Sequence, residues 1–511
     1  MISRISTIAF QGIKGIPVEV QVMVSPGRVG IQIVGLPDKA VIESRERIQS
    51  ALYSCGLALP AKRVTINLAP ADLPKEGSHY DLPIILALMA SIQAINRESL
   101  SRYLAVGEIN LDGSLAAING ALPAAICAKN LNKDLICPKV CGSEAAWASD
   151  SLNIIAPSNI LELTNHLNNK QQLSRPFKSE YKNRTNLANF SDIKGQKTIK
   201  RALEIAAAGG HNLLMIGPPG AGKSMLASCL PSILPPLSLK ESLEVSMIYS
   251  LSKKSSDESS FIQDRPFRTP HHFVTTAALI GGGTQVLPGE ASLAHNGILF
   301  LDELPEFSPH TLNSLRQPLE TGECIISRAN RKISYPARIQ LIAAMNPCRC
   351  GMSSRNENVC IRGPRCAIEY QSRISGPLMD RIDIRIAVPA VPATDLFSST
   401  NKSEPSEIIA SRVLLARKKQ KDRLEGIGSL LTHNAVCSPA LIEKIAILDL
   451  ESTVLLNQYA EKMLFSARGY HKILKIARTI ADLDSSEKIK KIHIAEAIAY
   501  RKSSQFSISN Q

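Results

Sequence analysis

A glycine-rich segment that ends in a lysine and a serine has the clearest chemistry in this sequence. Its glycines let consecutive backbone N–H groups curl around a phosphate, because no Cβ obstructs the approach. Lys223 would reach the β- and γ-phosphates of a nucleotide, and the Ser224 hydroxyl would bind Mg²⁺. The spacing Gly-x4-Gly-Lys-Ser therefore predicts a site for ATP and Mg²⁺. The residues of this site are Gly217, Pro218, Pro219, Gly220, Ala221, Gly222, Lys223 and Ser224.

An acidic pair, Asp302 and Glu303, supplies the second half of such a site. It directly follows a wholly apolar run, 298–301, which is typical of a strand buried on both faces of a parallel sheet. Ligands of open α/β sheets lie at the carboxyl ends of the strands. We expect Asp302 to hold the water shell of Mg²⁺ and Glu303 to polarise the attacking water. The alternative is an ordinary acidic turn.

Asn346 follows a third apolar run, 340–344, and is a further candidate for this edge of the sheet. Its amide could hold the attacking water or the γ-phosphate. Because Asn346 precedes Pro347, the alternative is a turn-forming asparagine.

Four cysteines in the pattern C-x-C-x9-C-x5-C follow this strand. Four thiolates could hold a structural Zn²⁺ tetrahedrally and fix a loop that has few apolar residues. The C-x-C spacing is tighter than that of most zinc sites, so free thiols are an equally supported interpretation. The four residues are Cys348, Cys350, Cys360 and Cys366.

The elements that must position these residues divide the chain into four parts. We expect a domain of strands and helices over 1–167, an exposed polar linker over 168–189, a nucleotide-binding core over 190–395 and a helical region over 396–511. In the core, an apolar strand at 212–216 precedes the glycine-rich loop and a helical run follows from Met225. Strand, loop and helix in this order are the context that the phosphate-loop motif requires. The fold class is therefore a multidomain α/β protein.

The charge of the chain is uneven. The 511 residues carry a net charge of +14, but residues 1–170 carry 15 basic and 14 acidic residues, whereas the other 341 carry 44 and 31. A basic excess in one part of a chain favours polyanionic partners, above all nucleic acid. A lysine-rich proteome is the alternative explanation.

The amino terminus lacks the apolar core of a secretory signal, and the longest apolar stretch, 82–95, is too short to span a bilayer. Eleven cysteines in such a chain are typical of reduced thiols. We therefore expect a cytoplasmic protein with no membrane partner.

The phosphate loop, the acidic pair and the Asn346 strand occur in the order of an AAA+ ATPase. Longer segments resemble the magnesium-chelatase-like branch and, within it, the competence-associated ComM (YifB) family. The resemblance extends over essentially the whole chain. The segments that carry it are Arg268-Thr-Pro-His-His272, 277–283, Pro288-Gly-Glu290, Leu293-Ala-His-Asn-Gly297 and Arg373-Ile-Ser-Gly-Pro-Leu-Met-Asp-Arg381-Ile-Asp383.

This resemblance implies an AAA+ core with a helical lid and adds two catalytic arginines. Arg381 matches the arginine finger that is presented to a neighbouring subunit, where a guanidinium neutralises charge on the transferred phosphoryl group. Arg468, within Ser466-Ala-Arg-Gly-Tyr470, matches the sensor arginine of the lid. If Arg381 acts in trans, the ATPase must be a ring, and the family implies a homo-hexamer.

Residues 323–337 predict a β-hairpin with a basic turn at 328–332. The family places such a hairpin before the Asn346 strand, facing a central pore. Arg328, Arg331 and Lys332 would then contact the phosphates of a single-stranded or branched DNA. A solvated loop is the alternative.

Residues 1–167 resemble the Lon-type protease domain, which has the α+β fold of ribosomal protein S5. Strands are expected at 18–24 and 64–68, and a helix at 38–56. The active protease needs a serine and a lysine. Aligned on Pro74-Lys-Glu-Gly77, the serine position holds His79, next to Ser78, and the lysine region, 119–124, contains no lysine. We therefore expect a domain without peptidase activity.

Together these features predict a hexameric Mg-ATP-driven DNA motor, which by family resemblance would promote helicase or branch-migration steps during natural transformation. The alternatives are a magnesium-chelatase-type ATPase subunit, an ATP-dependent protease and a remodelling ATPase that does not act on DNA.

Overall fold

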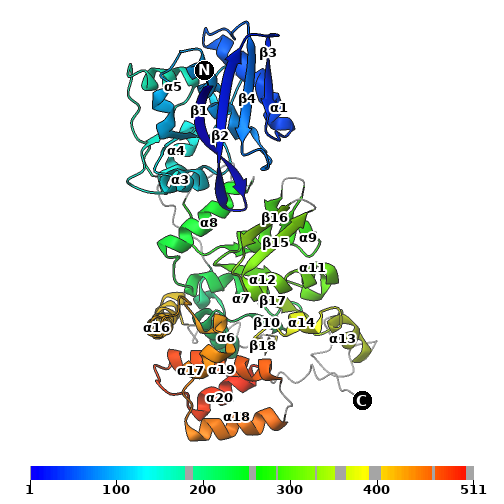
Figure 1. Ribbon diagram of the computed structural model, residues 1–511. Coiled ribbons are helices and arrows are strands. Elements are labelled where there is room, and N and C mark those ends of the chain that lie inside the picture. Colours follow the sequence, from blue (N-terminus) through cyan, green and yellow to red (C-terminus); the bar gives the residue numbers. More distant parts are fainter. Residues whose placement is uncertain are drawn as a thin grey trace. The chain divides into compact units, whose positions relative to one another are not determined.

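The chain forms two compact units in the computed structural model (Figure 1). The first comprises Met1–Lys182, Ser238–Gln263 and Ser327–Tyr335, and the second comprises Asn183–Leu237, Asp264–Ile326 and Pro336–Gln511. The structure describes residues 2–178, 188–252, 261–283, 286–328, 331–350, 364–390, 404–462 and 466–501. Residues 179–187 of the expected linker, 168–189, lie outside these ranges.

A seven-stranded mixed sheet is the centre of the first unit. Its order is β3-β4-β2-β1-β5-β8-β9. The long strands β1, β2 and β4 pair antiparallel, and the strands at both sides of them pair parallel. The bounds are β1 (Ile2–Gln11), β2 (Lys14–Ser25), β3 (Gly30–Val34), β4 (Arg63–Ala69), β5 (Tyr103–Ala105), β8 (Asp134–Ile136) and β9 (Ile154–Ile155). The strands expected at 18–24 and 64–68 are confirmed as parts of β2 and β4.

The helices of this unit follow the apolar periodicity of the sequence. Helix α1 (Lys39–Ser54) begins after Asp38, whose side chain accepts a hydrogen bond from the Val41 N–H, as an N-cap does. This confirms the helix expected at 38–56. Helix α2 (Asp81–Ser91) is almost wholly buried. The other helices are α3 (Ala121–Asn130), α4 (Lys139–Ala145) and α5 (Ile160–Leu167).

Helix α8 (Leu239–Leu251) also belongs to the first unit, although its sequence lies between elements of the second. The Gly120 N–H, at the start of α3, donates a hydrogen bond of 2.9 Å to the Ser250 carbonyl. After α8, Phe261 stacks on Trp147 with ring centroids 4.1 Å apart. The sequence pattern did not predict this association, because the periodicity of a helix does not identify the surface that the helix will cover.

A five-stranded parallel sheet is the centre of the second unit, in the order β11-β14-β17-β10-β18. Strands β14, β17 and β10 are buried along their whole length, as their continuous apolar sequences predict. The bounds are β10 (Leu213–Ile216), β11 (Phe267–Arg268), β14 (Ile298–Leu301), β17 (Gln340–Met345) and β18 (Ile384–Ala387). Because all five strands run in the same direction, the residues that follow β10, β14 and β17 share one edge of the sheet.

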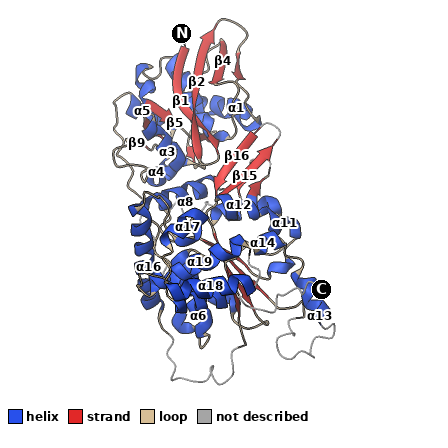
Figure 2. Cartoon of the chain, turned by 60° about the horizontal axis from the view of Figure 1, so that its bottom comes forward, coloured by secondary structure: helices blue, strands red, loops and turns tan. Residues whose placement is uncertain are grey.

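Helices surround this sheet, and the described residues from 404 onward form the helices of the C-terminal region (Figure 2). Residues of α6, α16, α19 and α20 share one apolar core with β10 and β18. The helices before that region are α6 (Lys197–Gly209), α7 (Lys223–Cys229), α9 (Thr276–Ile280), α10 (Glu290–Leu293), α11 (Pro309–Ser314), α12 (Arg316–Thr321), α13 (Pro364–Gln371) and α14 (Gly376–Met379). The later ones are α16 (Ser406–Gly426), α17 (Pro439–Ile445), α18 (Leu450–Lys462), α19 (Ala467–Leu483) and α20 (Lys491–Ala499).

Among the described residues, every helix is too short or too polar to cross a membrane.

Candidate nucleotide-binding site

The glycine-rich loop connects the end of β10 at Ile216 to the start of α7 at Lys223. Gly220 and Gly222 have φ values of +74° and +79°, a conformation that a side chain would strain, and an added Cβ at either position would meet no other atom within 4 Å. The loop thus surrounds open space with its backbone. This is the cradle that a phosphate group would fill, at the amino end of a helix.

The Lys223 ammonium lies inside this loop. Its Nζ donates hydrogen bonds to the Gly217 carbonyl (2.8 Å), the Pro218 carbonyl (2.9 Å) and the Asn346 Oδ1 (3.1 Å). Burial lowers the pKa of Lys223, and the carboxylates of Asp302 and Glu303 oppose that shift. The structure therefore brings the lysine, the asparagine at the end of β17 and the acidic pair together, as the sequence predicts.

Ser224 and Asp302 form the metal side of the site. The Ser224 Oγ donates a 2.5 Å hydrogen bond to the Asp302 Oδ2. A hydroxyl and a carboxylate oxygen at this separation fit the hard, oxygen-rich coordination of Mg²⁺, which also keeps several water ligands. The donor set is therefore compatible with the magnesium ion that accompanies a nucleotide.

Glu303 is the more exposed member of the acidic pair. Its side chain is 54% exposed, and its backbone has a φ of +50°, which turns the chain directly after β14. The Glu303 Oε2 lies 3.7 Å from the Nδ1 of His272, which follows the neighbouring strand β11. His272 ends the segment Arg268-Thr-Pro-His-His272, which carries part of the family resemblance, and no local pattern predicted its position beside Glu303.

Arg381 lies away from the phosphate loop of its own chain. Arg381 precedes β18, whose Ile384 pairs with Leu213 at the start of β10, so Arg381 lies at the amino edge of the sheet. The loop follows the opposite, carboxyl edge, and a four-residue strand separates the two edges by about 13 Å.

Arg381 and Arg468 share an acidic neighbour. The Arg381 Nη2 donates a 2.7 Å hydrogen bond to the Glu320 Oε2. This bond and the charges of Arg381 and then Arg468 lower the pKa of the Glu320 carboxyl. Arg468 itself is exposed in the first turn of α19, which Ser466 caps. Arg381 is therefore paired with Glu320 of α12, and the charge of Arg468 acts on the same carboxylate.

Comparisons with known proteins agree with this arrangement. Residues 189–396 match the family described as magnesium chelatase, subunit ChlI, residues 403–501 match its C-terminal family, and residues 20–140 match the family described as subunit ChlI of Mg-chelatase. The chain is 41% identical over 500 residues to the uncharacterized protein YifB of Escherichia coli K12, which covers 98% of this chain and 97% of YifB.

It is also 41% identical over 500 residues to the competence protein ComM of Haemophilus influenzae, which covers 96% of each chain. A match to the magnesium-chelatase 38 kDa subunit of Rhodobacter capsulatus is shorter, with 29% identity over 174 residues, 31% of this chain and 50% of that subunit. The chain belongs to the ComM/YifB family of magnesium-chelatase-like AAA+ proteins.

Three of the four cysteines of this ComM/YifB protein converge after β17. The sulfur atoms of Cys348, Cys350 and Cys366 lie within 4.8 Å of one another, and the first two are 3.1 Å apart. Three neighbouring thiols are the donor set of part of a tetrahedral zinc site, in which sulfur atoms about 2.3 Å from the ion lie about 3.8 Å from one another. Cys360 lies outside the described residues.

The expected hairpin of the ComM/YifB chain is confirmed as β15 (Glu323–Arg328) and β16 (Arg331–Pro336). Both strands extend further into the basic turn than the sequence analysis expected. Lys332 is exposed, whereas the side chains of Arg328 and Arg331 lie outside the described part of the chain.

The protease-like positions of the first unit are arranged differently from a serine–lysine pair. The Ser78 hydroxyl donates a hydrogen bond to a carboxylate oxygen of Glu108. His79 is buried with its Nε2 2.9 Å from the Ile8 carbonyl, and burial lowers the pKa of His79 to about 4. Lys75 is buried too, and its ammonium donates to the Pro70 carbonyl. Residues 119–124 pass into the start of α3.

Proposed function

We propose that this ComM/YifB-family protein is a hexameric motor that hydrolyses Mg-ATP and moves DNA. In this proposal it promotes helicase or branch-migration steps when incoming DNA recombines during natural transformation. The observation that carries the ATPase part is the meeting of the glycine loop, Lys223, the Ser224–Asp302 pair and Asn346 at one edge of a parallel sheet.

Each residue of this edge has a distinct task in hydrolysis. Lys223 and the loop N–H groups bind the phosphates, and Ser224 and Asp302 would hold Mg²⁺, whose charge favours phosphoryl transfer. Glu303 lies next to this pair with an exposed carboxylate, so it can orient a water molecule for attack on the γ-phosphate. Asn346, which already bonds Lys223, would hold the same water or the γ-phosphate.

The arginines support assembly into a ring. Arg381 and Arg468 lie near the same glutamate, Glu320, and Arg381 lies at the sheet edge opposite its own phosphate loop. A guanidinium so placed acts most directly on a nucleotide bound to another copy of the chain. A head-to-tail contact that repeats with a closing rotation forms a ring, and we propose a homo-hexamer.

Two observations support DNA as the substrate of the motor: the basic charge of the chain and the name of one relative. The net charge of +14 falls almost wholly on residues 171–511, and the exposed Lys332 lies in the hairpin beside Arg331 and near Arg328. A relative that is 41% identical is named a competence protein. Contacts from these three cations to phosphates would give affinity that depends on salt and not on base sequence.

Two further assignments complete the proposal. Cys348, Cys350 and Cys366, with Cys360, would bind a structural Zn²⁺ that fixes the segment after β17. Residues 1–167 would have the Lon-protease-like fold without peptidase activity, because the Ser78 hydroxyl is bonded to Glu108 and His79 occupies the serine position.

A magnesium-chelatase-type ATPase subunit is the second candidate. Families of that description match residues 20–140, 189–396 and 403–501. Steady-state ATPase assays distinguish the two. We expect forked, four-way or linear DNA to raise the rate several-fold above the basal level. Stimulation by a porphyrin with partner subunits, and none by any DNA, would replace the motor with the chelatase. Stimulation by unfolded protein would instead favour the protease alternative.

A further inference from the structure

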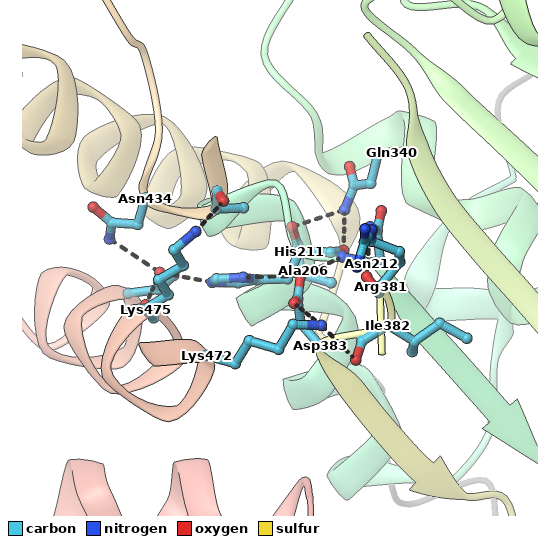
Figure 3. Close-up of polar contacts among 12 residues, drawn as sticks. Ala206, His211, Asn212, Gln340, Arg381, Ile382, Asp383, Asn434, Lys472 and Lys475 are labelled. Carbon is cyan, nitrogen blue, oxygen red and sulfur yellow. Dashed lines mark hydrogen bonds and ion pairs between the residues drawn. The ribbon is translucent and has the colours of Figure 1, made fainter. Parts of the chain in front are cut away.

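A buried polar network connects the helical region to the segment that carries Arg381 (Figure 3). At its centre, the Lys472 Nζ of α19 lies 3.0 Å from the Asp383 Oδ1. The same ammonium donates to the Ile382 carbonyl (3.1 Å) and to the Asp380 carbonyl. Lys472 thus binds the residues on both sides of Arg381, while its own helix carries Arg468 one turn earlier.

Asn212 attaches this segment to the sheet. Its Nδ2 donates to the Arg381 carbonyl (2.9 Å), its backbone N–H donates to the Asp383 Oδ2 (3.2 Å), and its Oδ1 accepts from the Leu341 N–H at 2.8 Å. Asn212 lies directly before β10, and Leu341 lies in β17. The other ends of these two strands lead to the phosphate loop and to Asn346. A change at the nucleotide edge can therefore reach the arginine segment through two short strands, of four and six residues.

The charges within the network are paired. Burial raises the pKa of the Asp383 carboxyl, but Lys472 and then His211 lower it by more, so the pKa lies well below its ordinary value and the carboxylate is charged. The His211 Nδ1 lies 3.7 Å from the Asp383 Oδ2, and its Nε2 is 2.9 Å from the Thr479 Oγ1, also in α19. Helix α19 is thus connected to Asp383 twice, directly through Lys472 and through His211 from Thr479.

We propose that Lys472 is a positioning residue that holds Arg381 and Arg468 as one rigid group, which each subunit presents to its neighbour's nucleotide. This inference rests on the proposed function, since it requires a ring that hydrolyses ATP with arginines in trans. The inference goes beyond the proposed function because it states that one buried ion pair, Lys472–Asp383, fixes the positions of both arginines. Lys472 touches neither the substrate nor the reacting atoms.

The test is complementation between two inactive variants. Lys472→Met leaves its own phosphate loop intact but presents misplaced arginines, and we expect kcat to fall about 10- to 100-fold with the ATP affinity unchanged. Glu303→Gln has an inactive site but presents normal arginines. In randomly mixed rings, about a quarter of the sites pair an intact loop with correct arginines, so mixing equal amounts should restore about a quarter of the wild-type rate.

Lys475→Met is the matched control. Lys475 is buried on the same helix, but its Nζ donates to the Ala435 carbonyl of the helical region and not to the 380–383 segment. We expect Lys475→Met to keep kcat within about twofold of wild type. Lys472→Arg, which retains the charge and the donors, should recover part of the lost rate. If Lys472→Met does not fold, Lys472→Met/Asp383→Asn removes both charges and replaces it in the mixing test.

Failure of this inference and failure of the proposed function give different results. Mixing Arg381→Ala with Glu303→Gln tests arginine action in trans directly, without Lys472. If that mixture is restored while the Lys472 mixture stays at the sum of its two components, Lys472 does not position the arginines. If neither mixture is restored, the arginine placement proposed for the ring is itself wrong.

Discussion

The Ser224–Asp302 pair of the second unit and the Ser78–Glu108 pair of the first unit both set a serine hydroxyl against a carboxylate. The pairs have the same chemical groups but different surroundings. Ser224 is the second residue of the helix that follows a glycine loop, with the Lys223 ammonium beside it. Ser78 lies in a short turn between Gly77 and a buried histidine.

The difference shows what a serine–carboxylate pair needs in order to become a nucleotide site. Parallel strands bring the loop, Asp302 and Asn346 to one edge, where backbone N–H groups and a lysine can bind negative charge. Near Ser78 the adjacent ring, His79, is uncharged at neutral pH because burial depresses its pKa, and the Lys75 ammonium is bonded to a carbonyl. The Ser78–Glu108 pair is therefore expected to stabilise a turn, and the Ser224–Asp302 pair to serve catalysis.

The largest expected effect is at Glu303, the residue that follows Asp302. Glu303→Gln should lower kcat about 10²- to 10⁴-fold, because the amide cannot polarise the attacking water. ATP binding should be retained, since Lys223 and the loop are unchanged. Steady-state ATPase and nucleotide-binding assays measure both quantities. Unchanged hydrolysis would show that Glu303 does not polarise the attacking water. It would also weaken the contrast between the nucleotide site and the Ser78–Glu108 pair.

The second effect concerns stability in the first unit. The pKa of His79 is about 4 when folded and near 6.5 when unfolded, so the unfolded state binds more protons and the stabilisation is lost as pH falls below 6.5. His79→Phe should remove about 2 kcal/mol of the difference in unfolding free energy between pH 7.5 and pH 5. Denaturant unfolding at both pH values tests this. An identical pH dependence in wild type and variant would mean that the pKa of His79 is the same in the folded and unfolded states.

A smaller effect is expected from a change that spares both serine–carboxylate pairs. Arg328→Glu/Arg331→Glu should weaken DNA binding and reduce the slope of log affinity against log salt by about 0.7 to 0.9 for each lost phosphate contact. Basal ATPase without DNA should stay at the wild-type level. The measurement is a salt titration of DNA binding by fluorescence anisotropy. An unaltered slope would support the alternative, that the hairpin turn is a solvated loop without phosphate contacts.

The smallest effect on activity is predicted for Ser78→Ala. Loss of one hydrogen bond to a carboxylate should cost about 1.5 to 3 kcal/mol of stability at most, and ATPase and DNA binding should change less than twofold. The matched substitution Ser224→Ala should instead abolish Mg-dependent hydrolysis. Equal losses of ATPase in the two variants would erase the distinction between the pairs.

Much of the nucleotide site could be predicted from the sequence because local patterns specify it. Continuous apolar runs indicated the buried strands β14 and β17, and the polar residues directly after them had to share an edge once the strands ran parallel. The glycine loop is likewise a local motif. These predictions need no knowledge of distant contacts.

Other features depend on topology and could not be predicted in this way. Lys472 and Asp383 are brought together by the contact of α19 with the segment before β18, and no local pattern around either residue indicates the other. His272 meets Glu303 only because β11 lies beside β14 in the sheet. The association of α8 with the first unit also depends on which surface the helix covers.

Calorimetric titration of Mg-ATPγS into the intact protein tests the central claim most directly. We predict saturable binding by the wild-type chain that disappears in Lys223→Ala and persists in Ser78→Ala. Absence of binding by the wild-type protein, or equal binding by Lys223→Ala, would contradict the assignment of the glycine loop as a nucleotide cradle.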